Sequence, residues 1–412
     1  MSKARPILLI ANNFPPVRGG SAVVYDNLAR GAGGRIIVLA PSIAYTDGLP
    51  TIGWREHDRM ASYRVIRLPL LRTVLDGGGE GWLRRQRFRA ADLLIRLRLT
   101  ATLLRLIRTE RVGAVCVGEL IASSWIVTLL AWLPGIRSIA YVHGEEITTD
   151  DGFDPTHRRA HDTLRAADQV VVVSRFTLGA VRALVGEGMD RRITLIENGV
   201  DTRRFRPQEK RADLLEEYRL QDCFVFVAVC RLLEKKGIDH AIRAFARVVA
   251  THPDCRFLVV GTGAYEAALR ACAREEGVAA QVVFAGDVAE SDLVAHYCLG
   301  DTFVMPNREL PNGDTEGFGL VFLEANSCGV PVIAGRDGGS RDAVQDGVNG
   351  LVVNGHSVDD IAAAMGRLRE DAGFRESLRR QGLAVAAAAD WSGRASAFLD
   401  VCDRERPART AS

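Results

Sequence analysis

Two glutamates stand eight positions apart in the stretch EGFGLVFLE, at Glu316 and Glu324. Ionised carboxylates only accept hydrogen bonds, and two of them in an otherwise apolar stretch could serve a ligand. The competing interpretation is an amphipathic helix that happens to begin and end with glutamate. The stretch alone does not decide between the two, so the residues around it must.

A cationic pair follows another apolar run. Arg231 comes almost directly after the run Phe224–Val229, and Lys236 stands five residues later, before Gly237 and a helical pattern. A planar guanidinium and a compact ammonium at one strand end suit a diphosphate group. A solvated basic loop is the alternative.

Two more apolar runs end in residues that could serve a ligand. His143 follows the run Ser138–Val142, where a purely structural histidine is the alternative. Gly19 and Gly20 open a helix after the first run, and their flexible backbone would let the helix N-terminus approach an anionic or hydroxyl-rich group. A plain turn before a helix is the alternative there.

Length, charge and cysteine usage exclude several protein classes. A chain of 412 residues exceeds what one core supports, so two domains are expected. A net charge of +2 argues against a nucleic-acid binder. The eight cysteines show no Cys-x-x-Cys spacing, which argues against a zinc or redox site and favours a reducing compartment. The N-terminus MSKARPILLIANN suits a first strand better than a signal peptide, so we expect a cytoplasmic protein.

Short apolar runs alternate with longer stretches of helical spacing, in two series. The first series comprises Ile7–Ala11, Arg35–Ala40, Arg64–Leu68, Gly113–Val117, Ser138–Val142 and Gln169–Val173. The second comprises Phe224–Val229, Arg256–Val260, Gln281–Ala285, Thr302–Met305 and Val330–Ala334. This pattern predicts two doubly wound α/β domains, each with a buried parallel sheet. Ligands bind outside the carboxyl ends of such strands, which is where the residues above stand.

The domain boundaries follow from breaks in this pattern. Glu197–Arg211 is rich in turn formers and charge and predicts a linker. We expect a first domain at 1–205, a second at 206–385, and at 386–412 a C-terminal helix that returns to the first domain, followed by a tail. The run Leu120–Leu133 is too short to span a bilayer and predicts a buried helix, and Asp76–Gly81 predicts a mobile loop.

In this order and at these spacings, the motifs resemble those of the retaining glycosyltransferases of family 4. The resemblance spans nearly the whole chain and includes the segments VSRFT at Val173–Thr177, NGVD at Asn198–Asp201, GVPVIAG at Gly329–Gly335 and WSGRA at Trp391–Ala395. It implies the GT-B fold, in which two doubly wound, Rossmann-like domains face each other across a cleft. One departure is Cys230, where the family usually has glycine.

The resemblance implies a role for each candidate residue. Catalysis would involve His143, Arg231, Lys236 and Glu316, with the two cations on the diphosphate, Glu316 on the hydroxyls of the transferred sugar and His143 near the reacting carbon and the phosphate. The donor would also contact the backbone of Gly317, Phe318 and Gly319, the backbone of Val288 near the base, and Glu324 at the ribose. Gly19 and Gly20 would lie on the acceptor side.

The resemblance also implies the reaction, which is transfer of a hexose from a nucleotide diphosphate sugar to a hydroxyl of a glycan or lipid-linked acceptor. No metal or other cofactor is expected, because two fixed cations can replace magnesium and the chain has no Asp-x-Asp triplet. The segments NRELPNGDTEGFG and GGSRDAV look most like mannosyltransferases that use GDP-mannose. A UDP-hexose donor is the first alternative. A sugar-nucleotide 2-epimerase and a non-catalytic sugar-nucleotide sensor are the others.

A basic stretch extends from Trp82 to Arg111. It holds nine arginines, with leucines interleaved at helical spacing, against only Asp92 and Glu110; the arginines are Arg84, Arg85, Arg87, Arg89, Arg96, Arg98, Arg105, Arg108 and Arg111. Such a helix can lie on an anionic membrane surface, which predicts a peripheral enzyme on the inner face of the membrane with a lipid-linked acceptor. Leucines that face the domain core beneath solvated arginines are the alternative.

Overall fold

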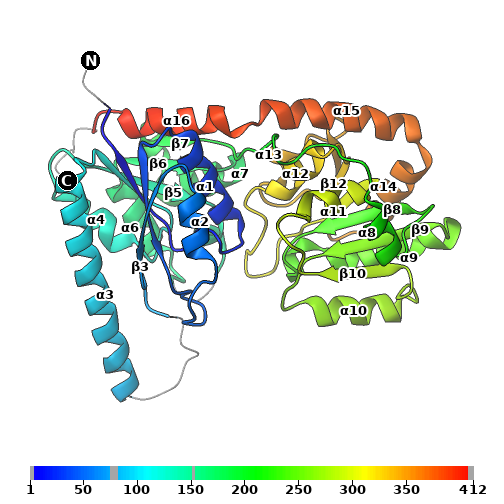
Figure 1. Cartoon of the computed structure of the whole chain (residues 1–412), viewed down its shortest axis with the longest axis horizontal. Helices are drawn as coiled ribbons and strands as arrows, with labels where there is room; N and C mark the ends of the chain where they lie inside the picture. The colour runs from blue at the N-terminus through cyan, green and yellow to red at the C-terminus, as the bar shows by residue number, and fades with distance from the viewer. Residues whose placement is uncertain (1–3, 75–81, 151–153, 407–412) are drawn as a thin grey trace.

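The computed structural model describes residues 4–74, 82–150 and 154–406. Within them the chain forms two α/β domains, each built on a parallel sheet, with a pair of long helices running along both (Figure 1). The predicted fold class is thereby confirmed. The boundaries proposed at residues 205 and 385 stay predictions. The loop expected at Asp76–Gly81 lies outside the described residues.

The first domain contains a seven-stranded sheet in the order β3-β2-β1-β4-β5-β6-β7, with every neighbouring pair parallel. Its strands are β1 (Ile7–Ile10), β2 (Ile36–Pro41), β3 (Arg64–Leu68), β4 (Ala114–Val117), β5 (Arg137–Val142), β6 (Gln169–Val172) and β7 (Ile193–Leu195). The central strands are buried along their whole length, as expected for a sheet covered on both faces.

Helices cover both faces of this sheet. They are α1 (Gly20–Gly31), α2 (Trp54–Met60), α3 (Trp82–Thr109), α4 (Ser124–Ala131), α5 (Glu145–Thr148), α6 (Arg158–Ala166), α7 (Arg175–Val185) and the 3-10 helix η1 (Glu187–Arg192). Because strand residues alternate between faces, Ile7 and Leu9 share a core cluster with Leu28 of α1, whereas Leu8 packs in the cluster of Leu103 from α3.

The second domain contains a six-stranded parallel sheet in the order β10-β9-β8-β11-β12-β13. Its strands are β8 (Phe224–Val229), β9 (Cys255–Val260), β10 (Val282–Gly286), β11 (Thr302–Met305), β12 (Val332–Gly335) and β13 (Gly350–Val353). Its helices are α8 (Ala212–Glu217), η2 (Glu234–Lys236), α9 (Ile238–Thr251), α10 (Glu266–Glu275), α11 (Leu293–Leu299), α12 (Leu320–Ser327), α13 (Ser340–Ala343) and α14 (Val358–Glu370).

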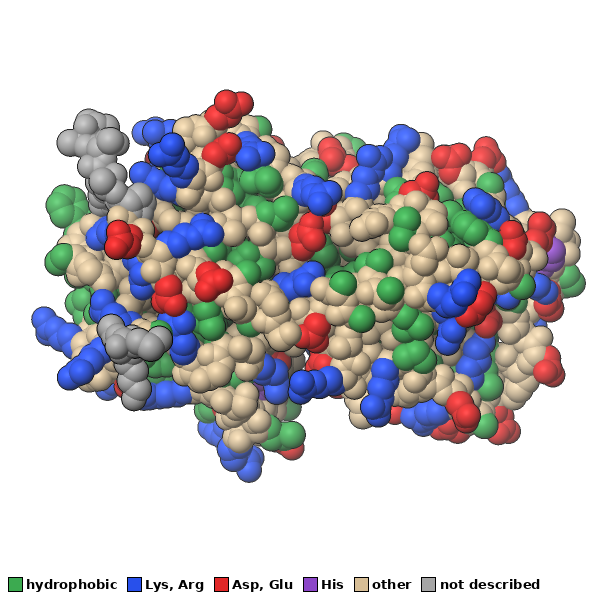
Figure 2. Space-filling model, turned by 90° about the horizontal axis from the view of Figure 1, so that it is seen from above, with side chains coloured by type: hydrophobic (Ala, Val, Ile, Leu, Met, Phe, Trp, Pro, Cys, Tyr) green, Lys and Arg blue, Asp and Glu red, His purple; other side chains and the backbone are tan. Residues whose placement is uncertain are grey.

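Two consecutive helices join the domains along one side of the molecule. Helix α15 (Ala372–Ala388) packs on α12, and α16 (Trp391–Asp403) packs on α1 of the first domain (Figure 1). A Cβ atom on Gly31 would come within 2.6 Å of the Ala395 side chain, so glycine lets the two helices approach closely. Seen from this side, the surface carries charged side chains of both signs (Figure 2).

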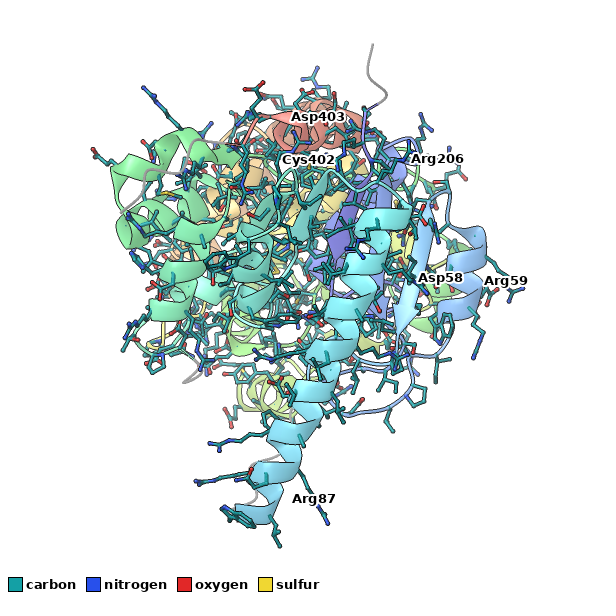
Figure 3. The ribbon with its side chains drawn as sticks, turned by 90° about the vertical axis from the view of Figure 1, so that its left-hand side faces the viewer. Asp58, Arg59, Arg87, Arg206, Cys402 and Asp403 are labelled. Carbon is teal, nitrogen blue, oxygen red and sulfur yellow. The ribbon has the colours of Figure 1, made fainter. Side chains whose placement is uncertain are left out.

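Helix α3 differs from the other helices of the first domain. Its C-terminal half packs on the sheet through the buried side chains of Leu99, Leu103 and Leu106. Its N-terminal half projects beyond the body of the protein, with Arg87 near the projecting end (Figure 3). None of the described helices combines the length and the apolar character that crossing a membrane requires.

The structure departs from the predicted elements in two respects. Strands β7 and β13 are absent from the predicted series, because β7 has only three half-buried residues at a sheet edge and β13 begins at a glycine. The helix expected to be buried over Leu120–Leu133 is shorter, since α4 covers only Ser124–Ala131 and buries one face. That prediction is wrong for Trp132, which is 82% exposed just after the helix.

Candidate active site

The two sheets bring their carboxyl ends together. His143 and Gly144 follow β5 of the first sheet, and Gly317 lies in the loop between β11 and α12 of the second. A Cβ atom on Gly317 would come within 2.2 Å of the carbonyl oxygen of His143, so glycine is what allows these backbones to touch. The segments that carry His143 and Glu316 are therefore in direct contact across the domain interface.

The paired glutamates occupy two different structural settings. Helix α12 begins at Leu320, and its N-cap residue Gly319 has a φ of 87°, in the left-handed region that favours glycine. Glu316 consequently lies in the loop before the helix, and the buried Phe318 stands between Glu316 and the start of the helix. Glu324 lies within the helix. The interpretation of one helix that begins and ends with glutamate is therefore wrong.

Lys236 and Glu316 form an ion pair whose side chains are 12% and 15% exposed. Burial alone would raise the pKa of the Glu316 carboxyl, but the ammonium groups of Lys236 and Lys235 lower it below its ordinary value. Glu316 is therefore ionised at neutral pH. The exposed Arg231 follows β8, and its positive charge reaches both Cys230 and Glu145.

Lys235 is a buried ammonium group that joins the two domains. Its Nζ donates hydrogen bonds to Asp314 at 2.7 Å and to the carbonyl oxygen of Thr315 at 3.2 Å, and it forms an ion pair with Glu145 of α5. Burial alone would lower the pKa of Lys235, but the two carboxylates raise it above its ordinary value. The loop that leads into Glu316 is thus tied to the first domain.

Glu324 is held in place from α11. The hydroxyl of Tyr297 donates a hydrogen bond of 2.6 Å to Oε2 of Glu324. Burial raises the pKa of the Glu324 carboxyl above its ordinary value, although this hydrogen bond opposes the shift. Within the described part of the chain, Oε1 of Glu324 has no hydrogen-bond partner, so one oxygen of the carboxylate can serve a ligand.

The residues expected near the nucleotide base of the donor and near the acceptor also lie where the domains meet. The guanidinium of Arg18 donates a hydrogen bond of 3.0 Å to the carbonyl oxygen of Val288 and forms an ion pair with Asp287. A Cβ atom on Gly20 would lie 3.8 Å from the Leu320 side chain, so the start of α1 faces the start of α12. Gly19 is the N-cap residue of α1.

Two ionisable groups after β5 have strongly perturbed pKa values. Burial lowers the pKa of His143 to about 4, against a smaller opposing effect of Glu145, so the imidazole is neutral at neutral pH. Burial raises the pKa of Glu146 to about 7, although its carboxylate accepts a hydrogen bond of 2.9 Å from the Gly144 N–H. Shifts of this kind cluster at functional sites.

Several residues of this region were not predicted from the sequence. Lys235 and Glu145 stand beside predicted residues, in EKKG and HGEE, and those adjacent charges were a usable signal. Tyr25 and Tyr297 occupy buried helical positions that look like ordinary core residues, so no pattern distinguished them.

The departure at Cys230 does not disturb the backbone path. The Cys230 N–H donates a hydrogen bond of 3.1 Å to the Val260 carbonyl oxygen. A Cβ atom on Gly261 would come within 2.0 Å of the Cys230 carbonyl oxygen, so only glycine fits at position 261. The glycine that this close approach requires is thus Gly261, which directly follows the neighbouring strand β9. In the described ranges, no group of three or more His, Cys, Asp or Glu side chains is arranged to hold a metal ion.

Comparisons with known proteins identify the class. A sequence model described as Glycosyltransferase Family 4 matches residues 18–204, and one described as Glycosyl transferases group 1 matches residues 210–384. The fold is that of a glycosyltransferase with two doubly wound domains.

Curated relatives extend over most of the chain. It is 33% identical, over 89% of its length and 89% of the relative's, to the GDP-mannose-dependent alpha-(1-6)-phosphatidylinositol monomannoside mannosyltransferase of Mycolicibacterium smegmatis. A second relative is the GDP-mannose-dependent monoacylated alpha-(1-6)-phosphatidylinositol monomannoside mannosyltransferase of Corynebacterium glutamicum. It is 28% identical over 95% of this chain and 96% of its own length. The chain belongs to the family 4 glycosyltransferases.

Solved structures agree with the fold. HepE of Anabaena in complex with UDP-glucose superposes with a TM-score of 0.75 at 20% identity, covering 96% of this chain and 98% of its own. Sucrose-phosphate synthase of Thermosynechococcus elongatus gives a TM-score of 0.74 at 21% identity, with the same coverage. At these identities the similarity concerns the fold alone.

Proposed function

We propose that this glycosyltransferase is a retaining mannosyltransferase that transfers mannose from GDP-mannose to a hydroxyl of a glycolipid. The observation that carries the proposal is the convergence of Arg231, Lys236 and Glu316 at one edge of the second sheet, in contact with the His143 segment of the first. The names of the mycobacterial and corynebacterial relatives support mannose, GDP and a phosphatidylinositol mannoside as the donor sugar, the nucleotide and the acceptor class.

The cations act on the diphosphate in this account. Lys236 has three N–H donors, so it can bind a phosphate oxygen while it remains paired with Glu316. Arg231 adds a planar fork that matches phosphate geometry. Negative charge grows on the diphosphate as its bond to the sugar carbon breaks, and both cations stabilise that charge without a metal ion.

The carboxylates bind the hydroxyl groups of the donor. Glu316 stays ionised because of the neighbouring ammonium groups, so it accepts hydrogen bonds from the hydroxyls of the transferred sugar. Glu324 has one oxygen fixed by Tyr297 and offers the other to the ribose. The segment around Val288 lies at the same interface and is where we place the base.

Helix α3 supports a lipid-linked acceptor. Four large apolar side chains of α3 are exposed and therefore point away from the core. They follow one another at spacings of 11, 4 and 7 residues, which are close to whole helical turns, so they share one face of the helix. They are Trp82, Leu93, Leu97 and Leu104; Leu83, Phe88 and Leu94 are also exposed on this helix but lie outside the stripe. The helix therefore has an outward apolar stripe in addition to its core-facing one, and the alternative in which its leucines only face the core is not sufficient.

Arginines flank the outward stripe on both sides. Helical geometry places Arg85, Arg89 and Arg96 along one flank, and Arg87, Arg98 and Arg105 along the other. The side chain of Arg84 lies outside the described part of the structure. An apolar stripe between two basic rows is the pattern of a helix that lies in the plane of an anionic membrane surface. We therefore place the enzyme at the inner face of the membrane.

A thermal-shift panel of GDP-mannose, GDP-glucose, UDP-glucose and UDP-galactose tests the donor. A ligand that binds the folded state raises the melting temperature by mass action, so GDP-mannose should give the largest shift. A larger shift with a UDP-hexose would replace the donor and leave the class intact. Incubation with donor alone tests the epimerase alternative, because an epimerase would release an altered sugar without any acceptor.

A further inference from the structure

Tyr25, on the second turn of α1, places its hydroxyl between two partners. Its oxygen lies 2.6 Å from the carbonyl oxygen of Gly118 and 2.7 Å from Nε2 of His143. The side chain is 1% exposed, and a Cβ atom on Gly118 would come within 2.6 Å of it, so glycine makes room for the phenol. A tyrosine hydroxyl carries a single proton and can donate one hydrogen bond.

The identity of the two partners decides where that proton goes. A carbonyl oxygen can only accept, so the short contact with Gly118 requires the Tyr25 proton. The contact between Tyr25 and His143 is then a hydrogen bond only if Nε2 of His143 carries a proton and donates it. The neutral imidazole has one N–H, so Nδ1 is left as a lone pair.

We propose that Tyr25 is a positioning residue that holds neutral His143 in the Nε2–H tautomer, so that Nδ1 serves as a hydrogen-bond acceptor for a substrate hydroxyl. Nδ1 has no hydrogen-bond partner among the described residues. A bare lone pair cannot bind a phosphate oxygen, which has no proton to donate. His143 therefore addresses a hydroxyl of the sugar or of the acceptor and leaves the diphosphate to the two cations. The tautomer is independent of the proposed function, whereas the role of Nδ1 rests on it.

The chain supplies a matched control in Tyr141. Its ring packs against both Tyr25 and His143, at centroid distances of 5.6 and 5.3 Å, and it is equally buried. Its hydroxyl is buried without a hydrogen-bond partner among the described residues. Tyr25→Phe and Tyr141→Phe thus remove the same atom from the same aromatic cluster, but only the first removes a partner of His143.

The test is ¹H–¹⁵N spectroscopy of histidine-labelled protein at neutral pH, with the His143 signals assigned by their loss in His143→Gln. Wild type and Tyr141→Phe should show a protonated Nε2, an unprotonated Nδ1 and a slowly exchanging Nε2 proton. Tyr25→Phe should lose the slow exchange of that proton. A protonated Nδ1 in the wild type, or unchanged exchange in Tyr25→Phe, would overturn the proposal.

Activity gives the second readout. Tyr25→Phe should lower kcat with the preferred nucleotide sugar roughly tenfold, the upper range for loss of one neutral hydrogen bond, while the KM for the donor changes little. Tyr141→Phe should keep wild-type kcat. An equal decrease of kcat in Tyr25→Phe and Tyr141→Phe would contradict the proposal, because it would show that Tyr25 acts only through packing. If no nucleotide sugar supports transfer, the proposed function fails, and the spectra still decide the tautomer.

Discussion

The ion pair between Lys236 and Glu316 sets a positive and a negative group side by side, as the proposed binding of a sugar diphosphate requires. The ammonium suits the phosphate, and the carboxylate suits the sugar hydroxyls. Each charge also stabilises the other at a site with little solvent exposure, as the lowered pKa of Glu316 indicates. Replacement of either residue therefore affects binding and its neighbour's charge together.

The first prediction concerns the leaving group. Lys236→Ala and Arg231→Ala should each lower kcat by roughly a hundredfold or more, the scale for loss of one preorganised electrostatic contact. EDTA should leave the wild-type rate unchanged. Lys210→Ala is the control, since Lys210 pairs with Asp301 on the surface of the same domain. Steady-state rates that survive both active-site substitutions, or that vanish with EDTA, would contradict the metal-free account.

The second prediction separates the two glutamates. Glu324→Ala should chiefly weaken nucleotide binding, because the ribose is held alike in the ground and transition states, whereas Glu316→Ala should chiefly lower kcat. Tyr297→Phe should resemble a mild Glu324→Ala, since it frees the carboxylate oxygen that the phenol holds. Calorimetric titration with free GDP is the measurement. Equal losses of GDP affinity in Glu316→Ala and Glu324→Ala would show that the roles are misassigned.

Residue types with strong chemical meaning could be identified from the sequence, but their partners could not. His143 directly follows a strand, and Lys236 and Glu316 lie in the connections after two other strands, which the alternation of apolar runs reveals. Tyr25 and Lys235 gain significance only from what packs against them across the fold or the domain interface. Such contacts join segments about a hundred residues apart, and no local pattern encodes them.

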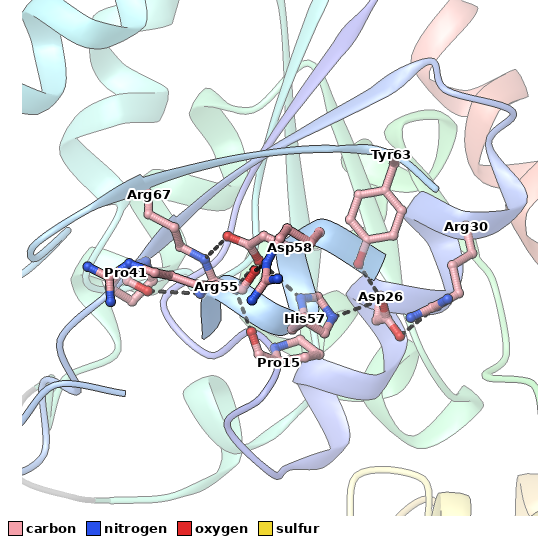
Figure 4. Close-up of polar contacts among 10 residues, drawn as sticks. Pro15, Asp26, Arg30, Pro41, Arg55, His57, Asp58, Tyr63 and Arg67 are labelled. Carbon is pink, nitrogen blue, oxygen red and sulfur yellow. Dashed lines mark hydrogen bonds and ion pairs between the residues drawn. The ribbon is translucent and has the colours of Figure 1, made fainter. Parts of the chain in front are cut away.

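Among the elements, α2 is fixed by a charged network (Figure 4). Arg67 of β3 pairs with Asp58 of α2 at 2.8 Å and donates to the Pro15 carbonyl at 2.6 Å. His57 of α2 lies 3.7 Å from Asp26 of α1 and 3.1 Å from Asp58. The network connects β3, α1 and α2 to the loop that leads into Gly19 and Gly20, on the expected acceptor side.

The third prediction follows from His57. The carboxylates of Asp26 and Asp58 raise its pKa above the ordinary value, although burial opposes them. The charged imidazole therefore stabilises the fold fully below about pH 6.5, and this contribution disappears as pH rises through the higher folded-state pKa. The melting temperature of wild type should exceed that of His57→Gln more at pH 6 than at pH 8.5. His161→Gln, at a more exposed histidine on the outer face of α6, is the control. A difference independent of pH would contradict this origin.

The fourth prediction concerns α3. Each arginine near an anionic surface contributes about 1 kcal/mol, screened by salt. Arg87, Arg89 and Arg98 changed together to Ser should reduce co-sedimentation with anionic liposomes, and wild-type binding should fall at high salt.

Its charge-matched control changes Arg158, Arg159 and Arg191 to Ser on exposed parts of the same domain. Equal binding by the two triple variants would leave α3 as an ordinary solvated helix. Trp82→Gln with Leu93→Gln should weaken the salt-resistant part of binding, because these side chains supply the apolar insertion.

At this scale the sequence predicts buried strands well and exposed apolar faces poorly. The runs at β8 and β11 match the structure because continuous apolar segments have one explanation in a parallel sheet. In α3, leucines serve two opposite faces, one on the core and one on the surface. Their combined pattern does not show which leucine faces which way until the sheet is in place.

For the molecule as a whole, charged contacts link the two domains where the strand ends face each other. Lys235 pairs with Glu145, Arg18 pairs with Asp287, and Arg204 lies 2.6 Å from Glu290. The linker, which contains Arg204, and α16 also connect the domains, and the backbones of Val200 and Asp390 form a bridge between these two segments. The residues that we propose for the donor and for the acceptor are thereby held on opposite sides of one interface, as group transfer between two substrates requires.

The central claim is transfer of mannose from GDP-mannose with retention of configuration. The direct measurement is transfer of labelled mannose from GDP-mannose to phosphatidylinositol monomannoside in anionic liposomes, with the anomeric configuration of the product determined by NMR. The account predicts an α-linked mannolipid, formed by wild type and nearly absent with Lys236→Ala or Glu316→Ala. A β-linked product, or no mannose transfer while a UDP-hexose is transferred to the same lipid, would contradict it.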